Sequence, residues 1–266
     1  MPFTPSHAIV ALPFVRTPLA PAAIAVGAMA PDLPLFTRGV LLDYGVTHDL
    51  RWLPLTALVA LVLLLVWRVV LRPACRPLAP RSLGARLPDE WDRGARDALR
   101  ETFGSAGRTA LLVIALAVGI VSHILWDAFT HEGRFGTGLI PALDASWGPL
   151  PGYKWLQYGS GIGGVIVLAI AGAVWLRHRV PQPVDAAPFV VRVTWWLSLP
   201  VVLIAAVVAG YALYGPFTTE FAPQHLAYRT LPIAAGVWGM LSLFLVVALR
   251  LVSARRLSAD AGAKER

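Results

Sequence analysis

Three side chains of metal-binding type follow one another at helical spacing near the middle of the chain. They are His123, Asp127 and His131, in the run Ser122–His131. Residues at i, i+4 and i+8 fall within about 80° of one another on an α-helix, so they would form one polar stripe. Imidazole and carboxylate groups together suit zinc or another transition metal. The alternative is a structural hydrogen-bonded pair of His123 and Asp127, with His131 at the interface.

Three more candidates lie in the first fifth of the chain, at His7, Asp32 and His48. Taken singly, each has an ordinary explanation as a helix start, a turn and a loop residue. Three histidines could hold one ion, whereas five or six ligands could hold two ions that bind a phosphoester and activate water. We therefore predict a divalent metal site, with zinc favoured and one or two ions, in which Asp32 and Asp127 are the catalytic carboxylates.

The composition indicates that much of the protein's surface faces lipid rather than water. Of the 266 residues, 57% are hydrophobic and 14% are charged, whereas soluble domains average about 25% charged residues. The net charge of +8 could indicate nucleic-acid binding, but the positive charges fall in particular loops, which favours a topological role. We expect the lipid bilayer as a partner and no nucleic acid, and the oligomeric state stays open.

Five stretches are apolar and long enough to cross a bilayer, which requires about 20 residues. Lipid offers no partner to backbone polar groups, so each should be a helix. We predict an all-α polytopic membrane bundle that forms a single domain over 1–257, with a disordered tail over 258–266. The stretches are Leu53–Leu71, Ala110–Thr130, Gly159–Leu176, Thr194–Tyr214 and Leu231–Leu249.

The loops between these stretches alternate in charge. Arg72–Arg108 contains eight arginines, whereas His131–Tyr158 contains only Arg134 and Lys154 as basic residues. Because basic loops stay in the cytoplasm, the C-terminus should be cytoplasmic and the metal-binding residues should face outward. The expected location is the bacterial cytoplasmic (inner) membrane.

The basic loop over 72–108 has an apolar pattern of its own. Trp91, Ala95, Leu99 and Phe103 recur every four residues, with charged residues between them. This pattern predicts a short amphipathic helix on the inner membrane surface. A helix that packs on the cytoplasmic end of the bundle would show the same pattern.

The N-terminal segment predicts a short or re-entrant helical hairpin. Ser6 could cap a helix that starts at His7, and the arm Ser6–Val15 would be only about 15 Å long. Prolines interrupt the apolar run that follows, so the second arm would return Asp32 to the side of His7. The alternative is a sixth span over Pro18–Phe36, which would place His7 inside.

Several of these motifs resemble a bacterial membrane family known as a domain of unknown function. The resemblance rests on the opening Met1-Pro2-Phe3-Thr4-Pro5-Ser6-His7-Ala8, the Gly27–Asp32 turn, the Ser122–His131 stripe and Leu156–Ser160. That family is similar to inner-membrane metal-dependent hydrolases and, more remotely, to zinc-dependent phospholipase C and the S1/P1 nucleases.

The resemblance implies metal-ligand roles for particular residues. His123 and Asp127 match a His-x-x-x-Asp helix pair, in which Asp127 would bridge ions, and His7, Asp32 and His48 would contribute from the N-terminus. The later His-x-x-x-Glu pair of the phospholipase group has no match, since Gln157 and Gly161 stand roughly where it would lie. One or two ions are therefore expected rather than three.

Two functions follow from these residues. The first is a metal-dependent hydrolase that acts on a phosphorylated or lipid-linked substrate at the outer membrane face. The second is a non-enzymatic membrane protein, a transporter subunit or a scaffold, that uses the same residues as a polar core.

Overall fold

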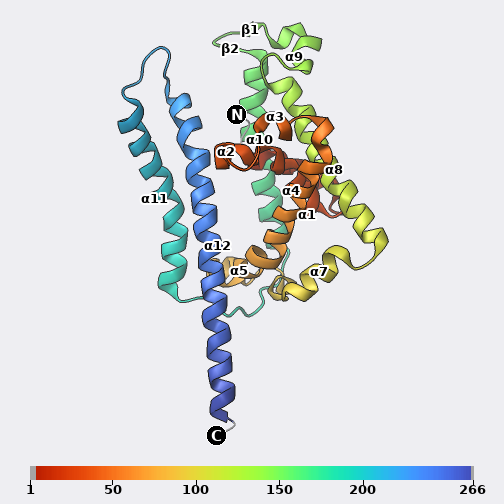
Figure 1. The fold of residues 1–266 in the computed structure, drawn as a ribbon, viewed down its shortest axis with the longest axis vertical. Coiled ribbons are helices and arrows are strands. Elements are labelled where there is room, and N and C mark those ends of the chain that lie inside the picture. Colours follow the sequence, from red (N-terminus) through yellow and green to blue (C-terminus); the bar gives the residue numbers. More distant parts are fainter. Residues whose placement is uncertain (1–3, 265–266) are drawn as a thin grey trace. The chain divides into compact units, whose positions relative to one another are not determined.

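The chain folds almost entirely into helices, as the sequence predicts. The computed structural model describes residues 4–264, with side chains up to Val252, and is 78% helical (Figure 1). The two strands in this part of the chain are β1 (Ser146–Trp147) and β2 (Leu150–Pro151), which pair antiparallel in one loop. The predicted all-α class is confirmed.

Five helical runs are long and apolar enough to cross a membrane, so this is a multi-pass membrane protein. Each run begins a few residues before the predicted stretch, because helices continue through polar first turns that an apolar window omits. The third, for example, begins at Gly152 and already includes the aromatic segment Tyr153–Tyr158. The runs are Leu50–Leu78, Ala106–Thr130, Gly152–Arg177, Phe189–Tyr214 and Pro223–Val252.

The described backbone groups into two compact units. The first consists of Met1–Leu65 and Arg96–Arg179, and the second of Val66–Ala95 and Val180–Arg266. The prediction of a single domain over 1–257 stays a prediction, because compactness alone does not show that either unit folds independently.

The first unit has two long helices, α8 (Ala106–Thr130) and α10 (Gly152–Arg177), and a series of short elements. The short elements before α8 are the 3₁₀ helix η1 (Thr4–Phe14), α1 (Pro21–Met29), the 3₁₀ turn η2 (Ala30–Asp32), α2 (Leu33–Thr37), α3 (Tyr44–Thr47), the 3₁₀ turn η3 (Leu50–Trp52), α4 (Leu53–Leu65) and α7 (Ala95–Phe103). Between α8 and α10 lie α9 (Phe135–Leu139), the 3₁₀ turn η6 (Pro141–Leu143) and the strand pair.

The second unit is dominated by α11 (Phe189–Tyr214) and α12 (Pro223–Lys264), which pack side by side (Figure 1). Its remaining elements are the π-helical turn η4 (Val66–Leu71), α5 (Arg72–Leu78), α6 (Arg81–Gly84) and the 3₁₀ turn η5 (Asp89–Asp92). The helix α12 continues through Lys264, and residues 265–266 lie outside the described part. The predicted disordered tail over 258–266 stays a prediction.

The N-terminal segment forms the predicted short hairpin, but its first arm differs in detail. The arm η1 is a 3₁₀ helix that already begins at Thr4, so Ser6 lies inside it and does not cap it. The second arm, Pro21–Thr37, is too short to count as a spanning helix, so the described chain does not support a sixth span. The hairpin closes where the Thr4 hydroxyl donates a hydrogen bond of 2.6 Å to Asp32.

The hairpin is seated on α8 through two glycines. A Cβ atom on Gly119 of α8 would lie 2.6 Å from the backbone nitrogen of Ala28, and one on Gly27 would overlap the backbone of Leu116. Ordinary contact begins near 3.4 Å, so only glycine permits this approach. Small residues serve this purpose at helix crossings in membranes.

The amphipathic helix expected in the basic loop is present as α7, with one correction. Trp91 belongs to the separate turn η5, and Gly94 lies between the two elements. On α7 itself, Ala98 and Thr102 form the buried side, whereas Leu99 and Phe103 are exposed.

Candidate metal centre

Helix α8 supplies the centre of the site. His123 and Asp127 lie one turn apart, and both are buried near the C-terminal end of the helix. His131 is the residue at which the helix ends, one further turn along. Most of this helix is apolar, and the buried His123 and Asp127 face the interior of the bundle, where costly ionisable groups of membrane helices usually lie.

Three short N-terminal elements bring the other candidates to this stripe. His7 lies within η1, Asp32 ends η2, and His48 follows α3. All three side chains are buried, and all lie in the same compact unit as α8. The structure therefore brings together the six residues that the sequence singled out.

Four ligand atoms form the tightest part of the cluster. The Nε2 atoms of His48 and His123 are 3.1 Å apart. Asp32 Oδ1 lies 3.9 Å from His48 Nε2 and 3.7 Å from His123 Nε2. Asp127 Oδ2 lies 3.6 Å from each of these nitrogens. Tetrahedral ligands about 2.0–2.1 Å from zinc would be about 3.4 Å apart, so these separations are close to those of a zinc site.

Backbone carbonyls determine which ring nitrogen of each histidine faces the cluster. His123 Nδ1 lies 2.7 Å from the carbonyl oxygen of Ala28, and His48 Nδ1 lies 3.0 Å from that of Tyr44. A carbonyl can only accept, so both Nδ1 atoms donate and, in the neutral rings, both Nε2 atoms hold lone pairs. Histidine ligands of metals are commonly oriented in this way.

These two lone pairs face each other across 3.1 Å. Two acceptors repel unless a proton or a cation lies between them. One added proton would compensate only one of the two nearby carboxylate charges, whereas a divalent cation would compensate both. The chemistry of the donor set therefore fits a divalent metal ion.

A second side of Asp127 faces His7. Asp127 Oδ1 and His7 Nε2 are 3.8 Å apart, and both atoms are buried without a hydrogen-bond partner in the described structure. Burial, followed by the neighbouring His123 imidazole, lowers the pKa of His7 from 6.5 to about 3. A neutral His7 keeps a lone pair for a cation. The groups able to hold an ion are His7, Asp32 and His123, and His48, His123 and Asp127.

His131 lies at the edge of the cluster. Its Nδ1 is 3.5 Å from Asp127 Oδ2, but it belongs to neither of the two groups. Its side chain is 25% exposed, compared with 6% for Asp127, so the cluster is most open here. Burial lowers the pKa of His131 below its ordinary value.

Several neighbours of the cluster are not among the metal-binding residues predicted from the sequence. Gln157 of α10 is fully buried with its amide 2.9 Å from His131 Nε2, and the Tyr44 hydroxyl lies 3.5 Å from Asp127 Oδ2. Thr4 holds Asp32 Oδ2 and leaves Oδ1 toward the histidines. Tyr44 stands four residues before His48, a helical spacing that could have indicated it.

A cation stands beside the open edge of the cluster. The half-buried Lys154 donates a hydrogen bond of 3.2 Å to Gln157 Oε1. Its ammonium group also lies 5.6 Å from the ring centre of Tyr153 and 6.0 Å from that of Tyr158. These partners are neutral, which leaves the positive charge available to an anionic ligand.

The histidines without an assigned role lie elsewhere in the chain. His178 is exposed at the C-terminal end of α10, and its ring forms a hydrogen bond with the carbonyl of Val174. His225 belongs to the second compact unit and accepts a hydrogen bond from the backbone of Ala222.

Comparison with known proteins identifies a family over nearly the whole chain. The family described as Domain of unknown function (DUF4184) matches residues 1–253. No curated protein and no solved structure matches significantly.

Proposed function

Since the chain belongs to the DUF4184 family, whose description states no activity, we propose its function from the site: a membrane-embedded, metal-dependent hydrolase of phosphoesters. The observation that supports it most strongly is that buried carboxylate oxygens of Asp32 and Asp127 each lie within 3.9 Å of the facing Nε2 atoms of His48 and His123. Lipid-linked phosphoesters are the favoured substrate class, because the cluster lies near the end of a spanning helix, where headgroups are found.

The metal is a divalent cation, with zinc favoured. Two groups of side chains that share His123 would be able to hold it, His48 with His123 and Asp127, and His7 with Asp32 and His123, which is consistent with one or two ions. His131, at the edge of the cluster, helps to position the carboxylate of Asp127. A divalent ion supplies a lowered water pKa and neutralises charge on phosphoryl oxygens.

The chain's own residues supply the rest of the chemistry. Asp127 Oδ1, which lacks a hydrogen-bond partner, is placed to accept a proton from the attacking water. Asp32 is held by Thr4 and is the alternative base. Lys154, beside the exposed edge at His131, binds a phosphate oxygen of the substrate. Gln157 contacts both Lys154 and His131 and so fixes their relative positions.

The arginine distribution supports a location for the site. Basic loops stay in the cytoplasm, so the C-terminus lies inside and the C-terminal end of α8, with the cluster, lies at the outer face of the bacterial cytoplasmic membrane. The opening motif resembles a family of unknown function that is in turn similar to inner-membrane metal-dependent hydrolases, and this supports the same class of activity.

One observation favours a non-enzymatic alternative. The side chains of His48, His123, Asp32 and Asp127 are all buried, and metal sites with a purely structural role are closed. In that case the ion joins the N-terminal hairpin to α8 in a scaffold or transporter subunit and reacts with nothing.

Metal analysis of detergent-purified protein tests both functions. Wild type should contain about one or two divalent ions per chain. His123→Ala and Asp127→Asn should lose most of the metal and all phosphodiesterase or phosphatase activity, while membrane insertion stays intact. Asp127→Asn is the sharper variant, because it keeps the size of the side chain and removes its charge.

The control is His178→Ala, which changes an exposed histidine outside the cluster. It should alter neither metal content nor activity. Full metal and full activity in Asp127→Asn would refute the site. Wild type that holds metal but hydrolyses no phosphoester would favour the structural alternative, and wild type without metal under any condition would exclude both metal roles.

A further inference from the structure

Helix α7 is joined directly to the N-terminal end of a spanning helix. Only Gly104 and Ser105 separate its last residue, Phe103, from the start of α8. A helix of 25 residues is about 37 Å long, which exceeds the roughly 30 Å of a bilayer's hydrocarbon core. The N-terminal end of α8, opposite His131, is therefore expected among the headgroups, and α7 ends beside it.

Buried, acidic and exposed side chains lie on different sides of α7. Ala98 and Thr102 are buried, whereas the acidic residues Asp97 and Glu101 share another side, four residues apart. Positions i, i+3, i+4 and i+7 lie on one face of a helix. That face is exposed and bears Arg96, Leu99, Arg100 and Phe103.

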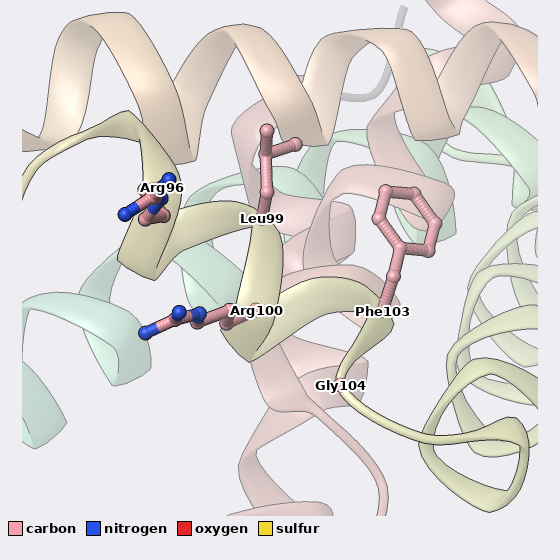
Figure 2. Close-up of a pocket in the computed structure, with 5 residues that line it drawn as sticks. All are labelled: Arg96, Leu99, Arg100, Phe103 and Gly104. Carbon is pink, nitrogen blue, oxygen red and sulfur yellow. The ribbon is translucent and has the colours of Figure 1, made fainter.

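The face borders a hollow of about 560 Å³. Figure 2 shows Leu99 and Phe103 extending upward from the helix, whereas the side chains of Arg96 and Arg100 extend to the left. Its lining is Arg96, Leu99, Arg100, Phe103 and Gly104. The hollow is shallow and open on one side, and its lining combines two cations with two apolar groups.

We propose that this hollow binds the headgroup of an acidic phospholipid, of the phosphatidylglycerol class. The guanidinium groups of Arg96 and Arg100 match the geometry of a phosphate, while Leu99 and Phe103 contact the upper acyl chains. Two apolar side chains are too few to seat a partner helix, which needs anchors over several turns. Free phosphate would leave the apolar pair uncovered, so an amphiphile fits the lining better.

The test uses the purified full chain and counts lipids retained from mixed micelles of phosphatidylglycerol and phosphatidylcholine by native mass spectrometry. Wild type should retain phosphatidylglycerol preferentially. Each basic residue near an anionic surface contributes about fivefold in affinity, so Arg96→Ala with Arg100→Ala should weaken retention by roughly thirtyfold. The substituted side chains are exposed, so folding should be intact, which size-exclusion chromatography can check.

The matched control is Arg177→Ala with Arg179→Ala, which removes the same charge at the end of α10. It should keep the preference of wild type. Leu99→Ala with Phe103→Ala should also weaken retention, because the acyl contact is lost although the arginines remain.

Three results would overturn the proposal. They are a wild type without preference for phosphatidylglycerol, an arginine double variant that keeps it, and displacement of the lipid by an equal concentration of inorganic phosphate. Metal content should be unchanged in all these variants, so the outcome is independent of the proposed hydrolase.

Discussion

The substitution Gly119→Ala tests whether the seating of the hairpin on α8 builds the metal centre. Gly119 is not a candidate ligand and lies one turn before His123 on α8. A methyl group there would lie 2.6 Å from the backbone nitrogen of Ala28 and still closer to the carbonyl oxygen of Ile24. Backbone atoms cannot rotate away, so α1 must move as a unit.

The size of the effect follows from these distances. Ordinary contact begins at 3.4 Å, so the gap to Ala28 must widen by at least about 0.8 Å from 2.6 Å, and the closer Ile24 carbonyl oxygen requires a larger shift. The same displacement would stretch the hydrogen bond from His123 to the Ala28 carbonyl from 2.7 Å to at least about 3.5 Å, at or beyond the limit of a hydrogen bond. Losing such a supporting bond weakens metal affinity by about 10–100-fold, and overpacking destabilises the fold by about 1–3 kcal/mol.

The assay is competition for zinc between the purified protein and a chelator of known affinity, together with thermal unfolding. The control is Gly163→Ala on α10, where a Cβ atom would meet nothing within 4 Å. It adds the same methyl group to a spanning helix and should leave affinity unchanged. If Gly119→Ala binds zinc as tightly as wild type, the close approach of α1 and α8 does not determine the site.

Three further predictions concern the substrate, the pH dependence and the topology. Lys154→Ala should raise KM for a phosphoester about tenfold, the value of one charge-assisted hydrogen bond, with metal content unchanged. Lys154→Arg should largely preserve KM. Equal KM in wild type and both variants would exclude the lysine from substrate binding. Unfolded His7 takes up a proton below about pH 6.5, whereas the folded side chain resists protonation down to about 3, so the thermal unfolding midpoint of metal-free protein should fall as pH falls through this window. His7→Gln should flatten that dependence, and an unchanged slope would show that His7 does not contribute to it. A reporter fused after Arg266 should be active only in the cytoplasm, and a reporter in the His131–Tyr158 loop only outside; the reverse pattern would invert the proposed orientation.

The membrane architecture could be predicted from the sequence because lipid leaves the backbone little choice. Apolar stretches such as Thr194–Tyr214 must be helical, since helices satisfy their own polar groups. Prolines at 18, 21 and 31 likewise limited the N-terminal arms to lengths that cannot cross. Exact starts were missed, as at Gly152, because the first turns of these helices are polar or aromatic and give no apolar signal.

Part of the candidate site was also visible in the sequence, since helical periodicity alone places His123 and Asp127 on one face. Only the tertiary structure decided how the remaining residues meet them. The opposed Nε2 atoms of His48 and His123, the carbonyl of Ala28 behind one ring and the amide of Gln157 beside His131 all join segments far apart in the chain. Sequence spacing reports neighbours along one helix, whereas these contacts depend on how closely α1 approaches α8, and two glycines set that distance.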